Sequence, residues 1–328
     1  MKPHSISTTD SSGLARKRIL VTGGSGFLGK AVLRRLDAVG CREVLWPSSG
    51  ELDLQDDRAF GDRLAEYDPD VVIHCAAECG GIGANIGQEG EFILANLRMG
   101  LNVVESSTLW NLRLVNIGSV CAYPLDCPQP MLEDDLWNGW PEPTNAYYGI
   151  AKRTIMAAVD ACRKQYGLSG VNLVLTNLYG PGDNFDLETS HFIPAQMRKM
   201  IEAGPVGTVQ LWGDGTPTRD LLFVDDAAEA IVEAAGRADV QGTINIATGE
   251  SHTIKKLARM VADTVGFHGG IEWDTSKPNG QPKRVLDTWR AKCRLDWSAK
   301  TALQDGLKQT HEWCKATTEV CGMRPVSI

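Results

Sequence analysis

The sequence lacks a long apolar run and a basic run. None of its hydrophobic stretches approaches the roughly 18 to 20 residues of a membrane-spanning helix, so no membrane contact is expected. Lys plus Arg number 33 against 41 Asp plus Glu, which gives a net charge of −8. Nucleic-acid binding is therefore disfavoured, because it needs a basic surface. An anionic ligand must instead meet a local cluster of positive charge.

Paired cysteines and a targeting segment are also missing. The nine cysteines, an odd number at scattered spacing, fit reduced thiols of a cytoplasmic protein better than a disulfide framework. Cys75 and Cys79 have no second pair and no histidine at suitable spacing, so no metal site is predicted. Residues 1–16 are rich in Ser and Thr without an apolar segment, which predicts a disordered tail rather than a secretory signal.

A glycine loop stands between a predicted strand and a predicted helix. The apolar residues 18–22 lead into a run of seven residues, and apolar side chains then recur at helical spacing. This order is typical of a dinucleotide site. The first glycine permits a tight turn, the second lets the backbone approach a pyrophosphate, and the third lets the helix pack on the strand. The run is Gly23, Gly24, Ser25, Gly26, Phe27, Leu28 and Gly29.

The second predicted strand, residues 43–46, does not end in a carboxylate. An acidic residue at this point would bind the ribose 2′-hydroxyl and select NAD. Instead the chain continues with Pro47, Ser48 and Ser49, and the first carboxylate is Glu51. The two serines favour a 2′-phosphate and hence NADP(H); an ordinary Pro-Ser-Gly loop is the alternative. In the buried strand predicted at residues 70–77, His74 is interpreted as a core residue rather than a ligand.

Tyr148 and Lys152 lie four residues apart on a predicted helix and so share one face, whereas Tyr147 points elsewhere. A lysine ammonium near a phenol favours the phenolate, which predicts that Tyr148 exchanges a proton nearer neutral pH than its free pKa of about 10. The strand predicted at 112–117 ends at Ser119 and Cys121, where the active-site groups of parallel sheets gather.

The alternation of elements predicts a doubly wound parallel sheet, the Rossmann arrangement, over residues 17–180. A smaller α/β substrate domain is expected over 181–328, with segments near 220–250 returning to the first domain. The predicted helices are 91–109, 193–202, 226–235, 253–265 and 302–314, and the later strands are 172–178, 209–212 and 243–246.

Several motifs resemble the extended short-chain dehydrogenase/reductases that act on nucleotide sugars, and most of all the GDP-L-fucose synthase family. The likeness runs from about Arg18 to near residue 315. Its stretches are VTGGSGFLGKAV, VIHCAAECGGIGAN, GSVCAYP, PTNAYYGIAK, TNLYGPGDN, SHFIPA, LWGDGTPTRDLLFVDD and SKPNGQPKRVLD. Gly182, Val120 and Gly149 depart from the family pattern.

The resemblance implies conversion of GDP-4-keto-6-deoxymannose to GDP-L-fucose by C3/C5 epimerisation and C4 reduction with NADPH. Tyr148 would donate the proton, Lys152 would hold the nicotinamide ribose, and Ser119 would hydrogen-bond the reacting oxygen. Cys121 and His191 would be the acid–base pair for epimerisation.

Further contacts are expected on the same grounds. Cofactor contacts are Asp53, Leu54, Ala76, Ala77, Asn177, Leu178 and His191, besides the glycine loop, Ser48, Ser49, Tyr148 and Lys152. Substrate contacts are Asn177, Lys199, Trp212, Arg219 and Lys283, although Trp212 can equally be a core residue. The resemblance also implies a homodimer formed by the helix at 91–109 and the Tyr148 helix.

Three other functions compete. A C4 epimerase would keep tightly bound NAD and would have no use for Cys121 and His191. A 4,6-dehydratase usually has an acidic residue soon after the serine, and none follows Ser119 here. A non-catalytic NADP-binding regulator typically loses the tyrosine or the lysine, and both are present.

Overall fold

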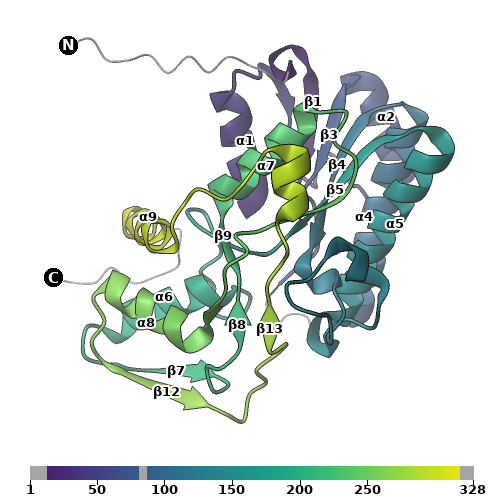
Figure 1. Cartoon of the computed structure of the whole chain (residues 1–328). Helices are drawn as coiled ribbons and strands as arrows, with labels where there is room; N and C mark the ends of the chain where they lie inside the picture. The colour runs from purple at the N-terminus through teal and green to yellow at the C-terminus, as the bar shows by residue number, and fades with distance from the viewer. Residues whose placement is uncertain (1–12, 81–86, 318–328) are drawn as a thin grey trace.

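A six-stranded sheet forms the centre of the protein (Figure 1). The computed structural model describes residues 13–80 and 87–317. The strand order is β10-β5-β4-β3-β1-β2, and every neighbouring pair is parallel. The predicted doubly wound parallel sheet is therefore confirmed. Its strands are β1 (Arg18–Thr22), β2 (Glu43–Leu45), β3 (Val71–His74), β4 (Arg113–Ser119), β5 (Ser169–Leu175) and β10 (Gly242–Ile246).

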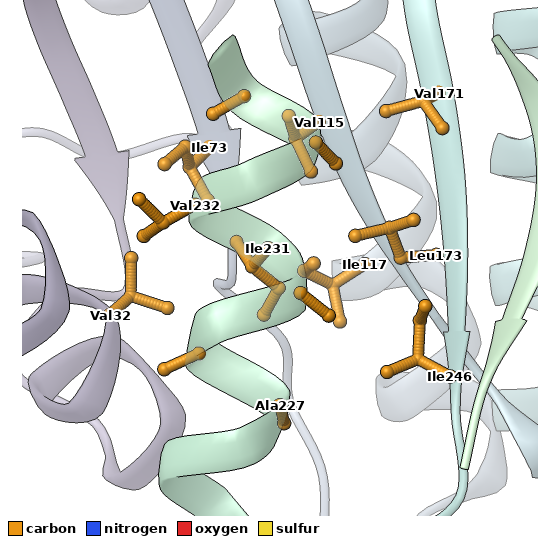
Figure 2. Packing of buried hydrophobic residues seen from close by; sticks show 14 of the residues in the cluster. Val32, Ile73, Val115, Ile117, Val171, Leu173, Ala227, Ile231, Val232 and Ile246 are labelled. Atoms are coloured by element: carbon orange, nitrogen blue, oxygen red, sulfur yellow. The ribbon is translucent and has the colours of Figure 1, made fainter. Parts of the chain in front are cut away.

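Helices cover both faces of this sheet. The first face carries α2 (Asp57–Tyr67), α4 (Glu89–Leu109) and α5 (Ala146–Tyr166), and the second carries α1 (Phe27–Ala38), α7 (Val224–Gly236) and the short helix η5 (Ala291–Leu295). Figure 2 shows Ile231 and Val232 of α7 among strand side chains such as Ile73 and Val115. This dry packing stabilises the sheet by apolar burial and holds the carboxyl ends of its strands in place.

A second, smaller unit packs beside the carboxyl ends of the strands. Its core includes Met197, Leu257, Val261 and Leu307. Its helices are α6 (Phe192–Ala203), α8 (Ile254–Val265) and α9 (Leu303–Ala316). Its strands are β6 (Asn177–Tyr179), β7 (Thr208–Trp212), β8 (Thr218–Arg219), β9 (Leu221–Phe223), β11 (His252–Thr253), β12 (Gly270–Asp274) and β13 (Lys283–Arg284). Although α7 and β10 follow this unit's first strands in the chain, they belong to the large sheet and its core.

The strand predicted at 172–178 is two strands. β5 ends at Leu175, and β6 pairs with β9 outside the large sheet. Thr176 Oγ1 and Asn177 Nδ2 both donate to the Asp220 carbonyl, at 3.0 and 3.2 Å, which turns the chain away from the sheet. Tertiary hydrogen bonds to a distant segment thus end a strand whose sequence runs on without a break.

The predicted disordered tail, residues 1–16, overlaps an ordered segment. Leu14–Arg16 form the 3-10 helix η1, and Leu14 is buried in the core against the large sheet. The prediction is therefore wrong for these three residues, because one apolar side chain suffices to dock the segment. Residues 1–12 lie outside the described residues, as do 81–86 with most of the Gly-Gly-Ile-Gly-Ala-Asn motif.

His74 is a core residue, as predicted. It is buried, and its Nδ1 lies 2.8 Å from Thr22 Oγ1 on the neighbouring strand. Burial lowers the pKa of His74 to about 3, with a further contribution from the charge of Lys152. The ring is therefore neutral at physiological pH, and its Nδ1 is hydrogen-bonded with the Thr22 hydroxyl.

The eight cysteines among residues 13–80 and 87–317 are free. Within that part of the chain, no helix combines the length and apolar character needed to cross a membrane. In the same two segments, no cluster of three or more His, Cys, Asp or Glu side chains can hold a metal ion.

Arg113 is the buried cation that closes the far end of the sheet. One of its terminal nitrogens, Nη2, donates to the carbonyls of Ala234, Arg237 and Val240, at 2.8, 3.0 and 2.8 Å. Burial lowers the pKa of Arg113 to about 10, so it stays charged at neutral pH. These bonds collect the carbonyls where α7 ends and satisfy groups that the helix itself cannot.

We expect Arg113→Met to lower the free energy of unfolding by roughly 2–4 kcal/mol, because three carbonyls would lose their charged donor. Urea unfolding followed by circular dichroism measures this. The control is Arg259→Met, at an exposed position on α8. Equal midpoints for the two variants would contradict the role of Arg113.

Candidate active site

The site is built first on the carboxyl end of β4. Ser119 ends this strand, and its Oγ accepts a hydrogen bond from the Cys121 N–H at 3.2 Å. The bond caps the 3-10 turn η2 (Val120–Ala122). The serine hydroxyl thus fixes the start of the turn that carries the thiol two residues later.

The helix α5 brings Tyr148 and Lys152 to the same point. The Ser119 hydroxyl is close enough to the Tyr148 phenol to lower its pKa. The buried Lys152 Nζ donates to the Ile117 carbonyl at 3.1 Å and lies 6.0 Å from the centre of the Tyr148 ring. The exposed Tyr147 makes an edge contact with Trp140, with ring centres 6.5 Å apart. The structure therefore brings together the serine, tyrosine and lysine and leaves Tyr147 outside.

The predicted shift in the pKa of Tyr148 is wrong in direction. Burial, followed by the nearby thiols Cys79 and Cys121, raises the pKa of Tyr148 well above its ordinary value, and the Ser119 hydrogen bond only partly opposes this. Burial also lowers the pKa of Lys152, with Cys79 and Cys75 opposing. The Lys152 ammonium is directed at the Ile117 carbonyl, and it is not among the groups that shift the pKa of Tyr148. Tyr148 is thus a protonated phenol at neutral pH, the form that can donate a proton.

The departure at Gly149 has a steric cause. A Cβ at this position would lie 2.2 Å from the Cys121 carbonyl oxygen, so only glycine lets α5 approach η2 this closely. Next on the helix, the buried Arg153 donates from Nε to the Ala122 carbonyl at 2.9 Å and from Nη1 to the Gly139 carbonyl at 3.0 Å. Sequence reasoning missed Arg153, since a basic residue beside Lys152 has the pattern of a surface charge.

A second arginine that the sequence did not single out contacts the thiol. Arg284 of β13 is buried, and its Nη1 donates to Cys121 Sγ at 3.7 Å. Its neighbour Lys283, predicted as a substrate contact, is exposed. The alternation of side chains along a strand puts the two cations on opposite faces, and the packing of the two-residue strand β13 decides which of them is buried.

Arg219 lies beside Arg284, since the two residues are paired in the β8–β13 register. Its Nη1 donates to the carbonyls of Thr218 and Gln281, at 2.8 and 2.7 Å. Burial and then the charge of Arg284 lower the pKa of Arg219 to about 10, so Arg219 stays charged at neutral pH. Two adjacent arginines form the local cluster of positive charge that the acidic composition required.

The other predicted substrate contacts are spread over the second unit. The Asn177 side chain donates to the Asp220 carbonyl, and Lys199 Nζ donates to the Gln210 carbonyl at 3.1 Å. Trp212 is 48% exposed, with the Lys277 ammonium 5.5 Å above its ring, so it is not a core residue. An exposed indole beside a cation can stack on a planar base.

His191 precedes α6 at its N-cap position. The ring is exposed, while surrounding protein lowers its pKa by desolvation, which favours the neutral imidazole. Among the described residues, no hydrogen bond joins His191 to Ser119, Cys121 or Tyr148. The histidine is thus carried by an element separate from the one that holds the thiol.

The glycine loop fits a dinucleotide pyrophosphate. Gly23 has a φ of 70°, and a Cβ there would lie 2.6 Å from the Ala76 nitrogen. A Cβ on Gly29 would lie 2.1 Å from the Gly23 carbonyl, so the start of α1 packs directly on the turn. Gly26 caps α1 without a side-chain hydrogen bond, which leaves the first N–H groups for an anion.

The serines predicted to meet a 2′-phosphate have a carboxylate beside them. The Ser48 N–H and hydroxyl both donate to Glu51 Oε2 at 2.8 Å, and these bonds lower the pKa of Glu51. Ser49 is exposed next to them, as is Asp53, whereas Leu54 is buried. Glu51 therefore competes for the donors that a 2′-phosphate would use.

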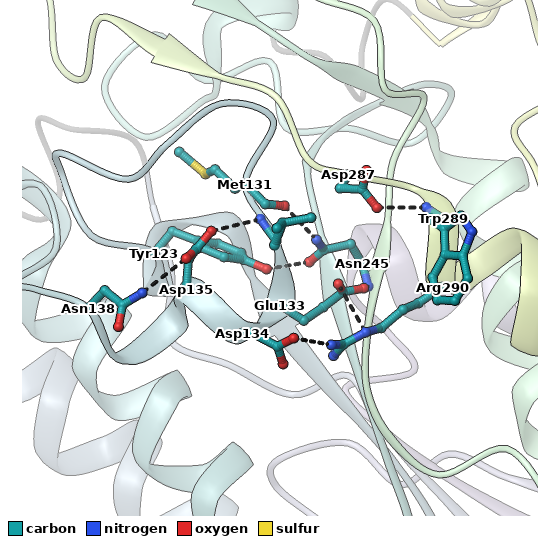
Figure 3. A network of polar contacts seen from close by, with 11 residues as sticks. Tyr123, Met131, Glu133, Asp134, Asp135, Asn138, Asn245, Asp287, Trp289 and Arg290 are labelled. Carbon is teal, nitrogen blue, oxygen red and sulfur yellow. Dashed lines mark hydrogen bonds and ion pairs between the residues drawn. The ribbon is translucent and has the colours of Figure 1, made fainter.

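A polar network anchors the segment between η2 and α5. Figure 3 shows Asn245 of β10 in its middle: its Oδ1 accepts from the Tyr123 hydroxyl at 2.7 Å, and its Nδ2 donates to the Met131 carbonyl at 3.0 Å. The buried Glu133 accepts from the Asn245 N–H at 2.9 Å and pairs with Arg290. The proline-rich loop is thus part of the fold and a fixed wall of the site.

A cavity of about 680 Å³ is lined by residues of α1, α6, α7 and α9 and by the segment between β6 and α6. None of the predicted catalytic residues lines it, although Asp183 does. Asp183 is buried, its Oδ2 has no hydrogen-bond partner among the described residues, and burial raises its pKa to about 7. The cavity therefore does not contain the predicted catalytic groups.

Together, the parallel sheet, the glycine loop shaped for a pyrophosphate and the Ser119-Tyr148-Lys152 group define an NAD(P)-dependent enzyme of the extended short-chain dehydrogenase/reductase class. A family model described as the NAD dependent epimerase/dehydratase family matches residues 19–247. The chain belongs to this family.

Relatives and solved structures narrow the group. GDP-L-fucose synthase 1 of Arabidopsis thaliana is 38% identical over 90% of this chain and 92% of its own. GDP-L-fucose synthase of Sinorhizobium fredii is 40% identical over 90% and 95%. A GDP-6-OMe-4-keto-L-xylo-heptose reductase from C. jejuni superposes with a TM-score of 0.87 at 29% identity, over 92% of this chain and 98% of that one. A GDP-L-fucose synthetase from Naegleria fowleri bound to NADP has a TM-score of 0.82 at 27% identity, over 93% and 95%. The predicted family is confirmed.

Asp183 predicts a pH dependence of stability. Its folded pKa of about 7 lies above its ordinary 3.8. The unfolded chain therefore ionises first, and the cost of burying the charge grows from about pH 4 to 7 and is complete above it. We expect the stability of Asp183→Asn relative to wild type to rise across this window by on the order of a few kcal/mol.

Thermal unfolding of both proteins as a function of pH measures this difference. Asp186→Asn is the matched control, because hydrogen bonds from Thr189 and Glu188 lower the pKa of that exposed carboxyl. The stability of Asp186→Asn relative to wild type should instead fall slightly as the pH rises. A difference for Asp183→Asn that does not change with pH would show that the carboxyl is not buried as described.

Proposed function

We propose that the protein is an NADPH-dependent epimerase/reductase that converts GDP-4-keto-6-deoxymannose to GDP-L-fucose. The observation that carries the proposal is the position of the Cys121 thiol. Cys121 follows Ser119 by two residues, and its thiol is close enough to Tyr148 to raise the pKa of the phenol. Simple reduction of a ketone requires the serine, tyrosine and lysine but no thiol. Epimerisation at the carbons beside the ketone requires further acid–base groups.

For reduction, Tyr148 donates its phenolic proton to the C4 oxygen, and the Ser119 hydroxyl donates a hydrogen bond to the same atom. The dinucleotide supplies the hydride when it is bound. Lys152 is buried and charged, so it offsets the negative charge left on the phenol and holds the nicotinamide ribose. The raised pKa of Tyr148 keeps the proton on the phenol until the C4 oxygen gains charge.

For epimerisation, the ketone acidifies the protons on C3 and C5. Cys121 and His191 exchange these protons from opposite faces of the sugar, and Ser119 and Tyr148 stabilise the enolate oxygen. The lowered pKa of His191 leaves its imidazole neutral near pH 7 and able to accept a proton. Ser119 and Tyr148 therefore act in both the epimerisation and the reduction.

We assign the diphosphate of the substrate to Arg219, with Lys199 and Lys283 as further substrate contacts. Trp212 stacks on the base or sugar, and Asn177 contacts the sugar. Partial burial strengthens the interaction of Arg219 with an anion, because the charge is less screened by water. A GDP-linked 4-keto sugar with a different substituent at C6 is the second candidate substrate, favoured by the similarity to the heptose reductase.

We also propose a homodimer formed through α4 and α5. Leu94 and Leu101, two turns apart on α4, are 51% and 41% exposed, which gives this helix an apolar outer face. Static light scattering of the purified protein tests the proposal. The mass of a single chain at micromolar concentration would contradict it.

The test of function is NADPH oxidation with GDP-4-keto-6-deoxymannose, followed by identification of the product. We expect Cys121→Ser and His191→Asn each to lose solvent-deuterium incorporation at C3 or C5 by about 100-fold or more, with NADPH binding retained. The matched controls are Cys293→Ser and His268→Asn, both at exposed positions. Deuterium exchange that persists in both active-site variants would contradict the roles of Cys121 and His191. Tightly co-purified NAD without NADPH oxidation would favour a C4 epimerase.

For the cofactor, an NAD(P)-type dinucleotide is expected of the family, and we propose NADP(H) specifically. Ser48 and Ser49 would meet the 2′-phosphate once Glu51 releases the Ser48 donors. We expect Glu51→Gln to tighten NADPH binding by about two- to fivefold while leaving NADH binding unchanged, since a surface carboxylate no longer repels the phosphate. Fluorescence titration with both dinucleotides measures this, and equal gains for the two would argue against a 2′-phosphate at this position.

A further inference from the structure

A buried arginine faces the thiol of the proposed acid–base pair. Arg284 is 6% exposed, and its Nη1 lies 3.7 Å from Cys121 Sγ, within hydrogen-bonding range for sulfur. A guanidinium always carries its charge in proteins, and a buried one requires a matching partner. Sulfur offers a strong match for that charge only as the thiolate.

The guanidinium is held in a fixed orientation. Its Nε donates to Gln281 Oε1 at 2.8 Å, and the Gln281 amide donates from Nε2 to the carbonyls of Pro124 and Leu125, at 3.1 and 2.8 Å. Gln281 is 2% exposed. The glutamine thus ties the arginine of β13 to the loop that directly follows η2 and Cys121.

The charges around Cys121 come from four elements. Arg284 approaches from β13 and Arg219 from β8, while Tyr148 faces the thiol from α5 and Cys79 from the segment after β3. Within residues 13–80 and 87–317, no carboxylate pairs with Arg284; its side-chain partners are an amide and the sulfur. The carboxylate of Glu142 also acts on Arg219. Arg284 is the cation that contacts the sulfur directly, and its charge favours a negative charge there.

We propose that Arg284, oriented by Gln281, is a positioning residue that holds Cys121 as a thiolate ready to remove the proton from C3 or C5. In that step the S–H bond forms as the C–H bond breaks, and the C–H electron pair moves into the enolate whose oxygen Ser119 and Tyr148 hold. The proposal rests on the proposed function for its catalytic meaning. The state of the thiol itself is a property of the free protein.

The experiment measures alkylation of Cys121 by iodoacetamide in the full chain as a function of pH, followed at this residue by mass spectrometry. We expect Arg284→Gln to slow alkylation near neutral pH about tenfold and to move the pH profile up by about one unit. Solvent-deuterium exchange into the substrate should fall by a similar factor, with NADPH binding and the KM for the GDP-sugar retained.

Arg284→Lys should give an intermediate profile, because it keeps the charge without the bond to Gln281. Lys292→Gln, at an exposed position, is the matched control and should leave the alkylation profile unchanged. Should Arg284→Gln fail to fold in thermal unfolding, Gln281→Met keeps the charge and removes its orientation; slowed alkylation is again expected.

Unchanged alkylation of Cys121 in the folded Arg284 and Gln281 variants would overturn the proposal. So would a raised KM with an unaltered alkylation profile, which would make Arg284 a diphosphate contact instead. Arginine-dependent alkylation without any exchange at C3 or C5 would support the thiolate and contradict the proposed function, so the two failures are distinguishable.

Discussion

The close crossing of α5 over the end of β4 is the contact on which the site depends. Gly149 lets the helix backbone rest against the Cys121 carbonyl, Lys152 donates to the Ile117 carbonyl, and Arg153 donates to the Ala122 carbonyl. Three successive points of one helix thus hold the strand end and the turn after it. A shift of the helix would separate the tyrosine from the serine and would move the thiol as well.

The second unit completes this arrangement through a few buried polar groups. Asp220, which is fully buried, accepts from the Thr248 hydroxyl at 2.7 Å and from the Gly249 N–H at 2.9 Å. Its own N–H donates to the Arg284 carbonyl at 3.1 Å, and its carbonyl receives Thr176 and Asn177. The residue thereby joins the end of β5 to the strands that carry both arginines, and it places the cations over η2.

Local patterns were sufficient where the chemistry is encoded within a few residues. The glycine loop, the Ser119 position and the Tyr148–Lys152 spacing were all read from short stretches, because helix and strand periodicities fix which side chains share a face. The pKa direction of Tyr148 was not predictable in this way, since desolvation depends on everything packed around the phenol. Arg284 was overlooked in favour of Lys283 for a similar reason: which of two adjacent cations is buried depends on how a two-residue strand docks.

The sequence by itself determined the parallel sheet, the dinucleotide loop and the set of groups available for acid–base chemistry, because each follows from local spacing and hydrophobic period. The tertiary structure decided what those groups are able to do. Long-range hydrogen bonds ended β5 at Leu175 and set Arg284 against Cys121, and apolar burial docked Leu14 in the core. Charge and burial at a site are sums over residues distant in the chain, and only the folded arrangement brings those contributions within a few ångströms of one another.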